Sequence, residues 1–245
     1  MDRTAARELR ILKAYAIAST VLMSVFCLAA FTRSNDKARF SEIDVERINV
    51  IEKDGTRRLV ISGKASMPGV VIEHKEYSSS RGVAGMLFYN DEGDEQGGLV
   101  FSGKSHDGSY TSTGSLTFDR YKQDQVLGLQ SIDENGQSYA GLSIWNRPAL
   151  SLVPFYVFRE RVIKMPNGPA RKAALDSLDS MTGGSAQRVF IGQSQRRDAI
   201  INLKDMNGKT RLRLAVDSLG APRLEFLDEK GQVVYLLRDS THVSH

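Results

Sequence analysis

Four carboxylates lie within five positions of one short stretch of the sequence: Asp91, Glu92, Asp94 and Glu95. Carboxylate oxygens are the ligands that calcium prefers, and paired carboxylates can also perform general acid–base catalysis. The stretch lacks the alternating acidic pattern of an EF-hand loop, whereas Asn90 and a central glycine are typical of a tight turn. Three interpretations follow: a solvated hairpin turn, which we favour, a weak divalent-cation site, and a pair of catalytic carboxylates.

Histidines are the other side chains that could bind metal or transfer protons. His74 and His106 stand alone, and no two histidines have the helical spacing of a zinc-binding pair. An enzyme would therefore need one of them to converge with the acidic stretch in the folded chain. The sequence also lacks the Gly-x-Ser-x-Gly nucleophile motif. We predict no cofactor beyond the weak cation.

The elements around these residues are predicted to be strands joined by tight turns. Apolar runs interrupted by Asp-Gly, Asn-Gly or Lys-Gly recur at residues 48–61, 127–145, 201–216 and 224–237. These dipeptides provide the positive φ of hairpin turns, and the arms alternate apolar and polar residues with the period of a strand. The acidic stretch falls between two such arms, so it lies at a hairpin tip. The pattern predicts roughly ten to twelve antiparallel strands between Ile43 and Leu237, within a β domain at residues 40–245.

One segment, at about residues 150–186, lacks this punctuation. Apolar residues have helical spacing over 155–165, and residues 170–181 predict a second short helix after a Pro-Asn-Gly-Pro break. We interpret the segment as a helical insertion. Because a sheet of this many strands leaves edges that invite aggregation, we expect the meander to close into a barrel or a barrel-like sandwich.

The N-terminus predicts a membrane anchor. Residues 14–31 carry no charge and include Ala14, Leu22, Phe26 and Phe31. As a helix they span about 27 Å, enough for a bilayer core. Residues 1–13 form a basic tail, so the positive-inside rule places them in the cytoplasm and the β domain outside, after a linker at 32–39. The alternative is a cleaved signal peptide and a secreted domain.

Charge and cysteine content exclude several classes of function. The net charge is +4, and residues 1–33 contribute five cations and two anions, so the remaining residues are almost neutral. No concentrated basic face is left for nucleic acid. The single cysteine, Cys27, lies inside the predicted anchor, which rules out disulfides, cysteine nucleophiles and cysteine-bound zinc in the β domain.

Two blocks of sequence, ERINVIEKDGT beginning at Glu46 and GMLFYNDEGDEQGGLVF beginning at Gly85, resemble a bacterial family of small exported or membrane-anchored proteins. The resemblance covers residues 40–148 best. It implies an exported protein but no particular activity, cofactor or catalytic residue.

These observations together predict a binding or interaction module anchored in the inner membrane by residues 14–31. Its partners would be the lipid bilayer at the anchor, and either a small apolar ligand inside a barrel or another envelope protein. Two alternatives stay open. One is an envelope enzyme, a hydrolase or isomerase, that uses the acidic stretch at residues 91–95; the other is a structural subunit of an envelope complex.

Overall fold

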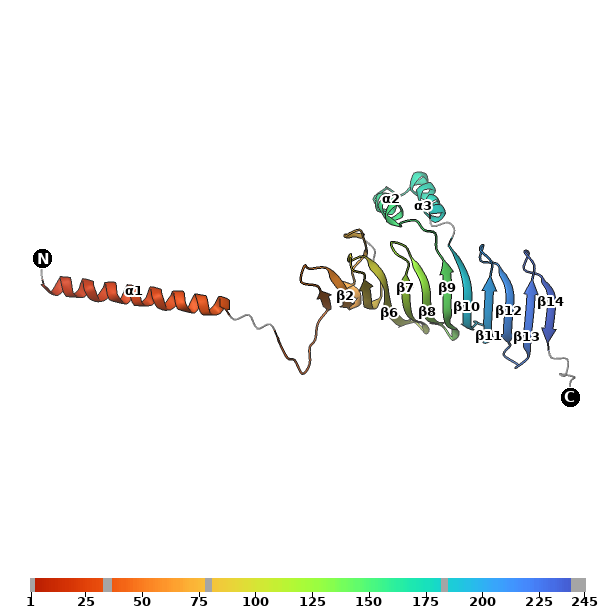
Figure 1. Cartoon of the computed structure of the whole chain (residues 1–245), viewed down its shortest axis with the longest axis horizontal. Coiled ribbons are helices and arrows are strands. Elements are labelled where there is room, and N and C mark those ends of the chain that lie inside the picture. Colours follow the sequence, from red (N-terminus) through yellow and green to blue (C-terminus); the bar gives the residue numbers. More distant parts are fainter. Residues whose placement is uncertain (1–2, 33–36, 78–80, 182–184, 239–245) are drawn as a thin grey trace. The chain divides into compact units, whose positions relative to one another are not determined.

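The structure is a computed structural model that describes residues 3–32, 37–77, 81–181 and 185–238. The chain divides into two compact units, Met1–Asp44 and Val45–His245. The first unit contains helix α1 (Arg3–Thr32), and the second contains the sheet and two further helices (Figure 1).

Helix α1 begins well before the uncharged segment, because the arginines and lysine that precede that segment are also good helix formers. Its span Ala6–Leu28 is long and apolar enough to cross a membrane, and none of the span is buried. Leu22 and Phe26 are 72% and 77% exposed, and Ala14 is exposed too. Phe31 lies in the helix, but its side chain is outside what the structure describes.

Hydroxyl groups within α1 are satisfied by the helix itself. The Thr20 hydroxyl donates to the Ala16 carbonyl at 2.8 Å, and the Ser24 hydroxyl donates to the Thr20 carbonyl at 2.9 Å. Such bonds allow serine and threonine to lie in an apolar environment without an unpaired donor. From Ala14 to Leu28 the helix therefore carries no charge, and these hydroxyl groups are bonded within it.

The second unit is built on one antiparallel sheet of twelve strands, which confirms the predicted mainly β meander. The order in the sheet follows the chain: β1 (Arg47–Ile51), β2 (Arg57–Ser62), β5 (Ala84–Tyr89), β6 (Glu95–His106), β7 (Ser109–Asp119), β8 (Gln125–Glu134), β9 (Gln137–Asn146), β10 (Ala186–Gln193), β11 (Ala199–Lys204), β12 (Thr210–Val216), β13 (Pro222–Leu227) and β14 (Val233–Arg238). A separate hairpin of β3 (Val70–Ile72) and β4 (Lys75–Tyr77) interrupts the meander after β2.

The three hairpin turns nearest the C-terminal end of the sheet share one construction. In the turns after β11, β12 and β13, the first residue is Asp205, Asp217 or Asp228, and its carboxylate accepts the backbone N–H groups two and four positions on, at 2.8 to 3.0 Å. These backbone donors lower the pKa of Asp205 and of Asp217. The aspartate thus fixes each turn, and the turns fix the pairing of successive strands.

The sheet is open, so the predicted closure into a barrel is wrong. Strands β1 and β14 lie at opposite ends of the strand order and do not pair with each other. Local turns determine only which neighbours pair, and nothing in them forces the first strand to meet the last. The open sheet is compatible with the other prediction, a barrel-like sandwich, provided that a second layer is present.

One face of the sheet is covered near its N-terminal end, and we call this side the covered face. Val60 of β2 and Leu87 of β5 are 0% and 1% exposed there, packed against Val71 of the β3–β4 hairpin. The hairpin in turn packs against helix α2 (Val153–Ile163), where the rings of Tyr77 and Tyr156 lie 5.3 Å apart. The two hydrophobic clusters of buried residues in the described part of the domain lie here.

The helical insertion is present as predicted, between β9 and β10, and consists of α2 and α3 (Pro169–Met181). The two helices contact each other, and Figure 1 shows both beyond one end of the central strands. Lys75 of β4 bonds Glu160 of α2 at 2.9 Å, which ties the insertion to the hairpin.

Candidate functional site

The acidic stretch forms the turn between β5 and β6. Its construction repeats that of the C-terminal turns, because the Asn90 side-chain oxygen accepts the backbone N–H groups of Glu92 and Asp94 at 2.9 and 3.0 Å. The central glycine has a φ of +77°. The turn is therefore explained by its own hydrogen bonds and requires no ligand to hold its shape.

The four acidic side chains point to different partners. Asp91 is 95% exposed and pairs with Arg58 at 2.7 Å, while both Glu92 carboxylate oxygens accept from the Tyr121 hydroxyl. Asp94 is only 1% exposed and accepts the backbone N–H of His74 at 3.4 Å, and Glu95 pairs with Arg81. Asp91 and Glu92 thus behave as parts of a solvated turn, whereas Asp94 and Glu95 are inside the protein.

The acidic turn has no set of side chains suited to a metal ion within the described residues. The histidine, cysteine, aspartate and glutamate residues of the described part of the chain form no group of three or more that could hold an ion. The backbone N–H of His74 bonds Asp94 of the acidic turn, and the side chain of His106, the last residue of β6, is 78% exposed beside Asp107. Neither histidine side chain is seen to meet the acidic side chains.

Glu95 instead belongs to a buried polar cavity on the covered face. The cavity has a volume of about 120 Å³ and is enclosed by the end of β7, the start of β6 and β8, the β3–β4 hairpin and α2. Its lining residues are Val70, Ile72, Arg81, Glu95, Asp119, Gln123, Asp124, Gln125, Leu152 and Tyr156. Two arginines compensate its acids, Arg81 at Glu95 and Arg147 at Asp124, the latter at 3.2 Å.

Asp119 is the most perturbed group in this cavity. Burial raises its pKa to about 8, and the nearby charges of Glu95 and Asp124 add to the rise. Its Oδ1 atom has no hydrogen-bond partner among the described residues. Burial also raises the pKa of Glu95, against the opposing charge of Arg81, and raises the pKa of Tyr156 to about 12. At pH 7 the carboxyl of Asp119 is therefore mostly protonated, and in that form it can donate a hydrogen bond into the cavity.

The opposite side of the sheet carries a different feature, which follows from the strand pairings. One residue of each strand lies directly opposite its neighbour in a single row across the sheet: Ile48, Ile61, Met86, Leu99, Leu116, Leu129, Leu142, Ile191, Ile201, Leu214, Leu224 and Leu237. Every position in this first row is aliphatic.

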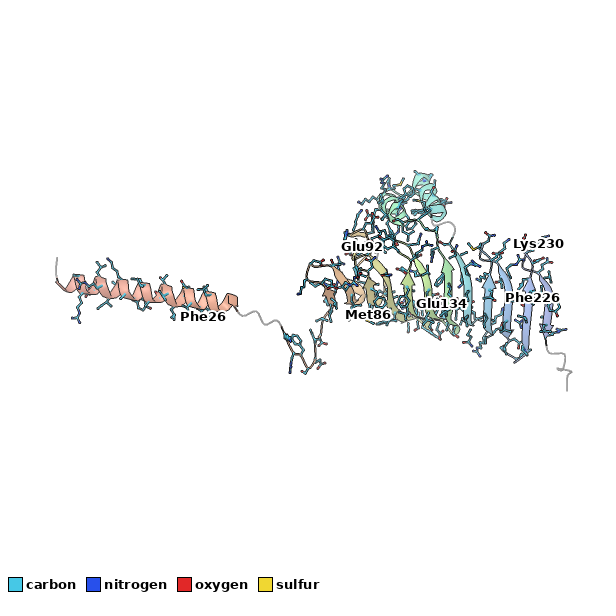
Figure 2. The ribbon with its side chains drawn as sticks, viewed as in Figure 1. Phe26, Met86, Glu92, Glu134, Phe226 and Lys230 are labelled. Carbon is cyan, nitrogen blue, oxygen red and sulfur yellow. The ribbon has the colours of Figure 1, made fainter. Side chains whose placement is uncertain are left out.

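A second row lies beside the first, two residues along each strand and hence on the same side. Its members are Val50, Leu59, Phe88, Gly97, Phe118, Leu127, Ile144, Val189, Leu203, Leu212, Phe226 and Tyr235. We call the surface formed by the two rows the apolar face. It carries no charged residue, and Met86 and Phe226 mark it near the two ends of the sheet (Figure 2).

Gly97 is the one position of the apolar face without a side chain. It has a φ of +129°, and a Cβ atom there would lie 2.2 Å from the Thr117 carbonyl oxygen. The rings of Phe88 and Phe118, on the strands either side, stack across it with centroids 6.3 Å apart. The glycine therefore lets β6 and β7 approach while the neighbouring rings keep the row continuous.

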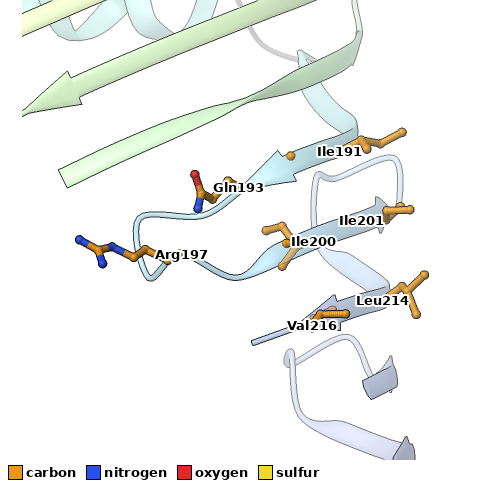
Figure 3. A pocket seen from close by; sticks show the side chains of 10 residues that line it. Ile191, Gln193, Arg197, Ile200, Ile201, Leu214 and Val216 are labelled. Carbon is orange, nitrogen blue, oxygen red and sulfur yellow. The ribbon is translucent and has the colours of Figure 1, made fainter. Parts of the chain in front are cut away.

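None of the large side chains of the apolar face is buried; each is either exposed or half-buried. Leu129 is 50% exposed, Ile191 45%, Leu214 47% and Tyr235 58%. Two open depressions follow it, one of about 500 Å³ over β6 to β10 and one of about 520 Å³ over β10 to β12. Figure 3 shows Ile191, Ile201 and Leu214 of the second depression extending to the same side of the sheet.

The polarity of strands β11 to β13 identifies which side faces water. On the covered face, Arg213 donates to Glu225 at 3.0 Å and to Asn202 at 3.1 Å, and Arg223 forms an ion pair with Glu225 at 3.0 Å. An antiparallel sheet with one solvated side places its polar residues there and its apolar residues against a core. In β11 to β13 the polar residues lie on the covered face, which is therefore the side suited to water in this part of the sheet. The apolar face has the composition of a protein core.

Sequence patterning found the hairpin with the acidic turn but missed both larger features. Asp119 and Arg81 are far from Glu95 in the chain, and only the pairing of β6 with β7 brings the two carboxylates together. The two rows could have been recovered from the alternation of single strands, but only once the register between the strands was known.

Comparison of the chain with protein-family models and with curated proteins finds no match. The resemblance of the two blocks at residues 40–148 to a family of exported proteins therefore stays a prediction.

Proposed function

We propose that the protein is an interaction module of the cell envelope, anchored in the inner membrane by α1, whose binding surface is the apolar face. The observation that carries the proposal is the unbroken run of apolar side chains across all twelve strands. A monomeric soluble protein seldom exposes an apolar patch above about 300–600 Å², and large patches mark interaction sites. Depressions that are open to solvent suit a broad partner better than an enclosed small molecule.

The anchor completes the proposal. The span Ala6–Leu28 is long and apolar enough to cross a membrane, and the basic residues of the chain's first 13 positions precede its uncharged part, which begins at Ala14. The positive-inside rule then puts the N-terminus in the cytoplasm and the β domain outside. Digestion of spheroplasts with an added protease is expected to remove the β domain and leave a short membrane-embedded fragment. Protection of the β domain would refute this orientation, and a mature chain that begins near residue 30 would refute the anchor.

The binding surface is tested by chemical protection in native membranes. Leu129→Cys places a thiol on the apolar face, and Gln130→Cys places one on the covered face of the same strand, both in a Cys27→Ser background. A membrane-impermeant maleimide added from the outside is expected to label position 130 readily. It should label position 129 only after the partner has been removed by purification. Equal labelling at both positions in membranes would refute the proposed surface.

A second candidate function is an envelope hydrolase or isomerase that uses the buried cavity. The raised pKa of Asp119 beside Glu95 favours it, because an acid with a pKa near neutrality is suited to proton transfer. The cavity of about 120 Å³ is small compared with substrate sites of about 300–1,000 Å³, which is why we place this candidate second. Hydrolysis of model esters, glycosides or peptides that Asp119→Asn abolishes would establish it.

A further inference from the structure

The apolar face needs a second layer packed against it, and the extent of the face indicates what that layer is. In strands β11 to β13 the described chain supplies a single layer: polar bonds and ion pairs lie on one side of it, and the two apolar rows lie on the other. An antiparallel sheet becomes independently stable when it packs one face on another layer. The second layer of this domain must therefore come from outside the chain that the structure describes.

We infer that the cover is a second copy of the same chain, packed apolar face to apolar face as a two-fold β-sandwich. This inference rests on the proposed function and names its partner. Two sheets of a sandwich stack about 10 Å apart with their inner side chains interdigitated, and a two-fold dimer uses the same patch on both copies. The apolar face meets that requirement because it is uncharged and has the same two-row construction on every strand.

The available area is that of a stable dimer. The exposed large side chains of the two rows run from 37% exposed at Ile48 to 58% at Tyr235. With roughly 70–100 Å² still accessible on each of a dozen such side chains, the face offers on the order of 1,000 Å² per copy, or about 2,000 Å² for the pair. That total lies at the border between standard interfaces and those of obligate homodimers.

The shape of the face argues against a lipid or small apolar ligand as the cover. Enclosed ligand sites bury about 70–90% of the ligand, and an acyl chain lying in an open depression would leave much of its own surface in water. A second identical sheet leaves neither surface exposed. Anchoring by α1 would also confine both copies to one membrane and so raise their effective concentration.

The experiment identifies the cover directly in the membrane. The full chain is expressed with p-benzoylphenylalanine in place of Leu129, near the middle of the strand order, where any two-fold overlap brings the copies together. The matched control carries the same group in place of Gln130, which points to the covered face. Cells co-express two differently tagged copies, are irradiated, and the products are separated and probed for both tags.

The expected product is a cross-linked pair that carries both tags, formed from position 129 and at most in traces from position 130. In a second experiment one tagged copy carries Leu129→Lys and the other carries the photoprobe at Leu142. The yield of the two-tag product is expected to fall at least about tenfold, which corresponds to ~1.4 kcal/mol of binding free energy. Burying an unpaired lysine in the dry interface costs several times that amount. Gln130→Lys should leave the yield unchanged.

Other outcomes overturn the inference in distinguishable ways. A product from position 129 that joins one tag to lipid or to a different protein refutes the second copy while leaving the proposed interaction surface in place. Equal two-tag yields from positions 129 and 130 refute the face-to-face arrangement and indicate association elsewhere, such as at the edge strand β14. No product from position 129, together with free labelling of Leu129→Cys, refutes both the inference and the proposed function.

Discussion

Replacing Asp119 by asparagine is expected to change how the stability of the β domain depends on pH. In the folded protein the pKa of this carboxyl is raised from 3.8 to about 8. Between these two values the folded chain holds a proton on Asp119 that the unfolded chain has lost. The folded state thus binds more protons, and the free energy of unfolding must decrease as the pH rises through this interval.

The magnitude follows from the size of the shift. Each pKa unit corresponds to about 1.4 kcal/mol, so the full interval costs as much as roughly 5 kcal/mol between pH 4 and pH 9. Asparagine has nearly the same shape and does not ionise. Asp119→Asn should therefore match the wild type near pH 4 and become more stable than it by several kcal/mol, about 3–5, at pH 9.

The assay is urea unfolding of the full chain in lipid nanodiscs at a series of pH values, followed by the fluorescence of Trp145, the only tryptophan. Asp176→Asn, which changes an exposed carboxylate on α3, serves as the control and should keep the wild-type pH dependence. A parallel loss of stability in Asp119→Asn and in the wild type as the pH rises would refute the raised pKa of Asp119.

Three further predictions concern the sheet and the acidic turn. Gly97→Ala should destabilise the fold by about 2–4 kcal/mol, because its Cβ would meet the Thr117 carbonyl oxygen at 2.2 Å. Gly114→Ala, whose Cβ would have nothing within 4 Å, should be tolerated. Equal melting temperatures of the two variants would contradict the predicted clash at Gly97. Leu87→Ala should lower the free energy of unfolding by about 2–5 kcal/mol, because Leu87 is buried. Leu129 is half exposed, so Leu129→Ala should lower the free energy of unfolding of the monomer by under about 1 kcal/mol. Urea titrations of both variants measure the two losses. Millimolar calcium should leave the melting temperature unchanged, because the acids at residues 91–95 contact separate partners. An increase of several degrees in the melting temperature with calcium would instead support the interpretation as a cation site.

Local chemistry explains why so much of the architecture was predictable. Alternation at residues 201–216 and the glycines of the turns specify strands and their direct neighbours, because the side-chain period of a strand is two and a tight turn pairs its own arms. The helical spacing over 155–165 likewise predicted α2, which forms at Val153–Ile163. The interruption of the meander was predicted for the same reason.

Local patterns did not predict which acids of the turn at residues 91–95 are buried. The sequence pattern predicted a hairpin tip at residues 91–95, but it contains nothing that distinguishes the exposed acids of the tip from the buried ones. Burial of Asp94 and Glu95 comes from the β3–β4 hairpin folding over the sheet, and the raised pKa of Asp119 comes from the pairing of β7 with its neighbours. Solvent exclusion depends on which distant segments pack together, which no local pattern encodes.

By itself, then, the sequence determined the β-meander, its turns, the helical insertion, the apolar N-terminal helix, and which residues of each strand share a side. Only the tertiary structure decided that the sheet stays open, that Glu95 and Asp119 share a cavity, and that the apolar residues of twelve strands align into two continuous rows. The physical reason is that turns and alternation act over a few residues. Closure, burial and the alignment of rows depend instead on the register and packing of segments that are far apart in the chain.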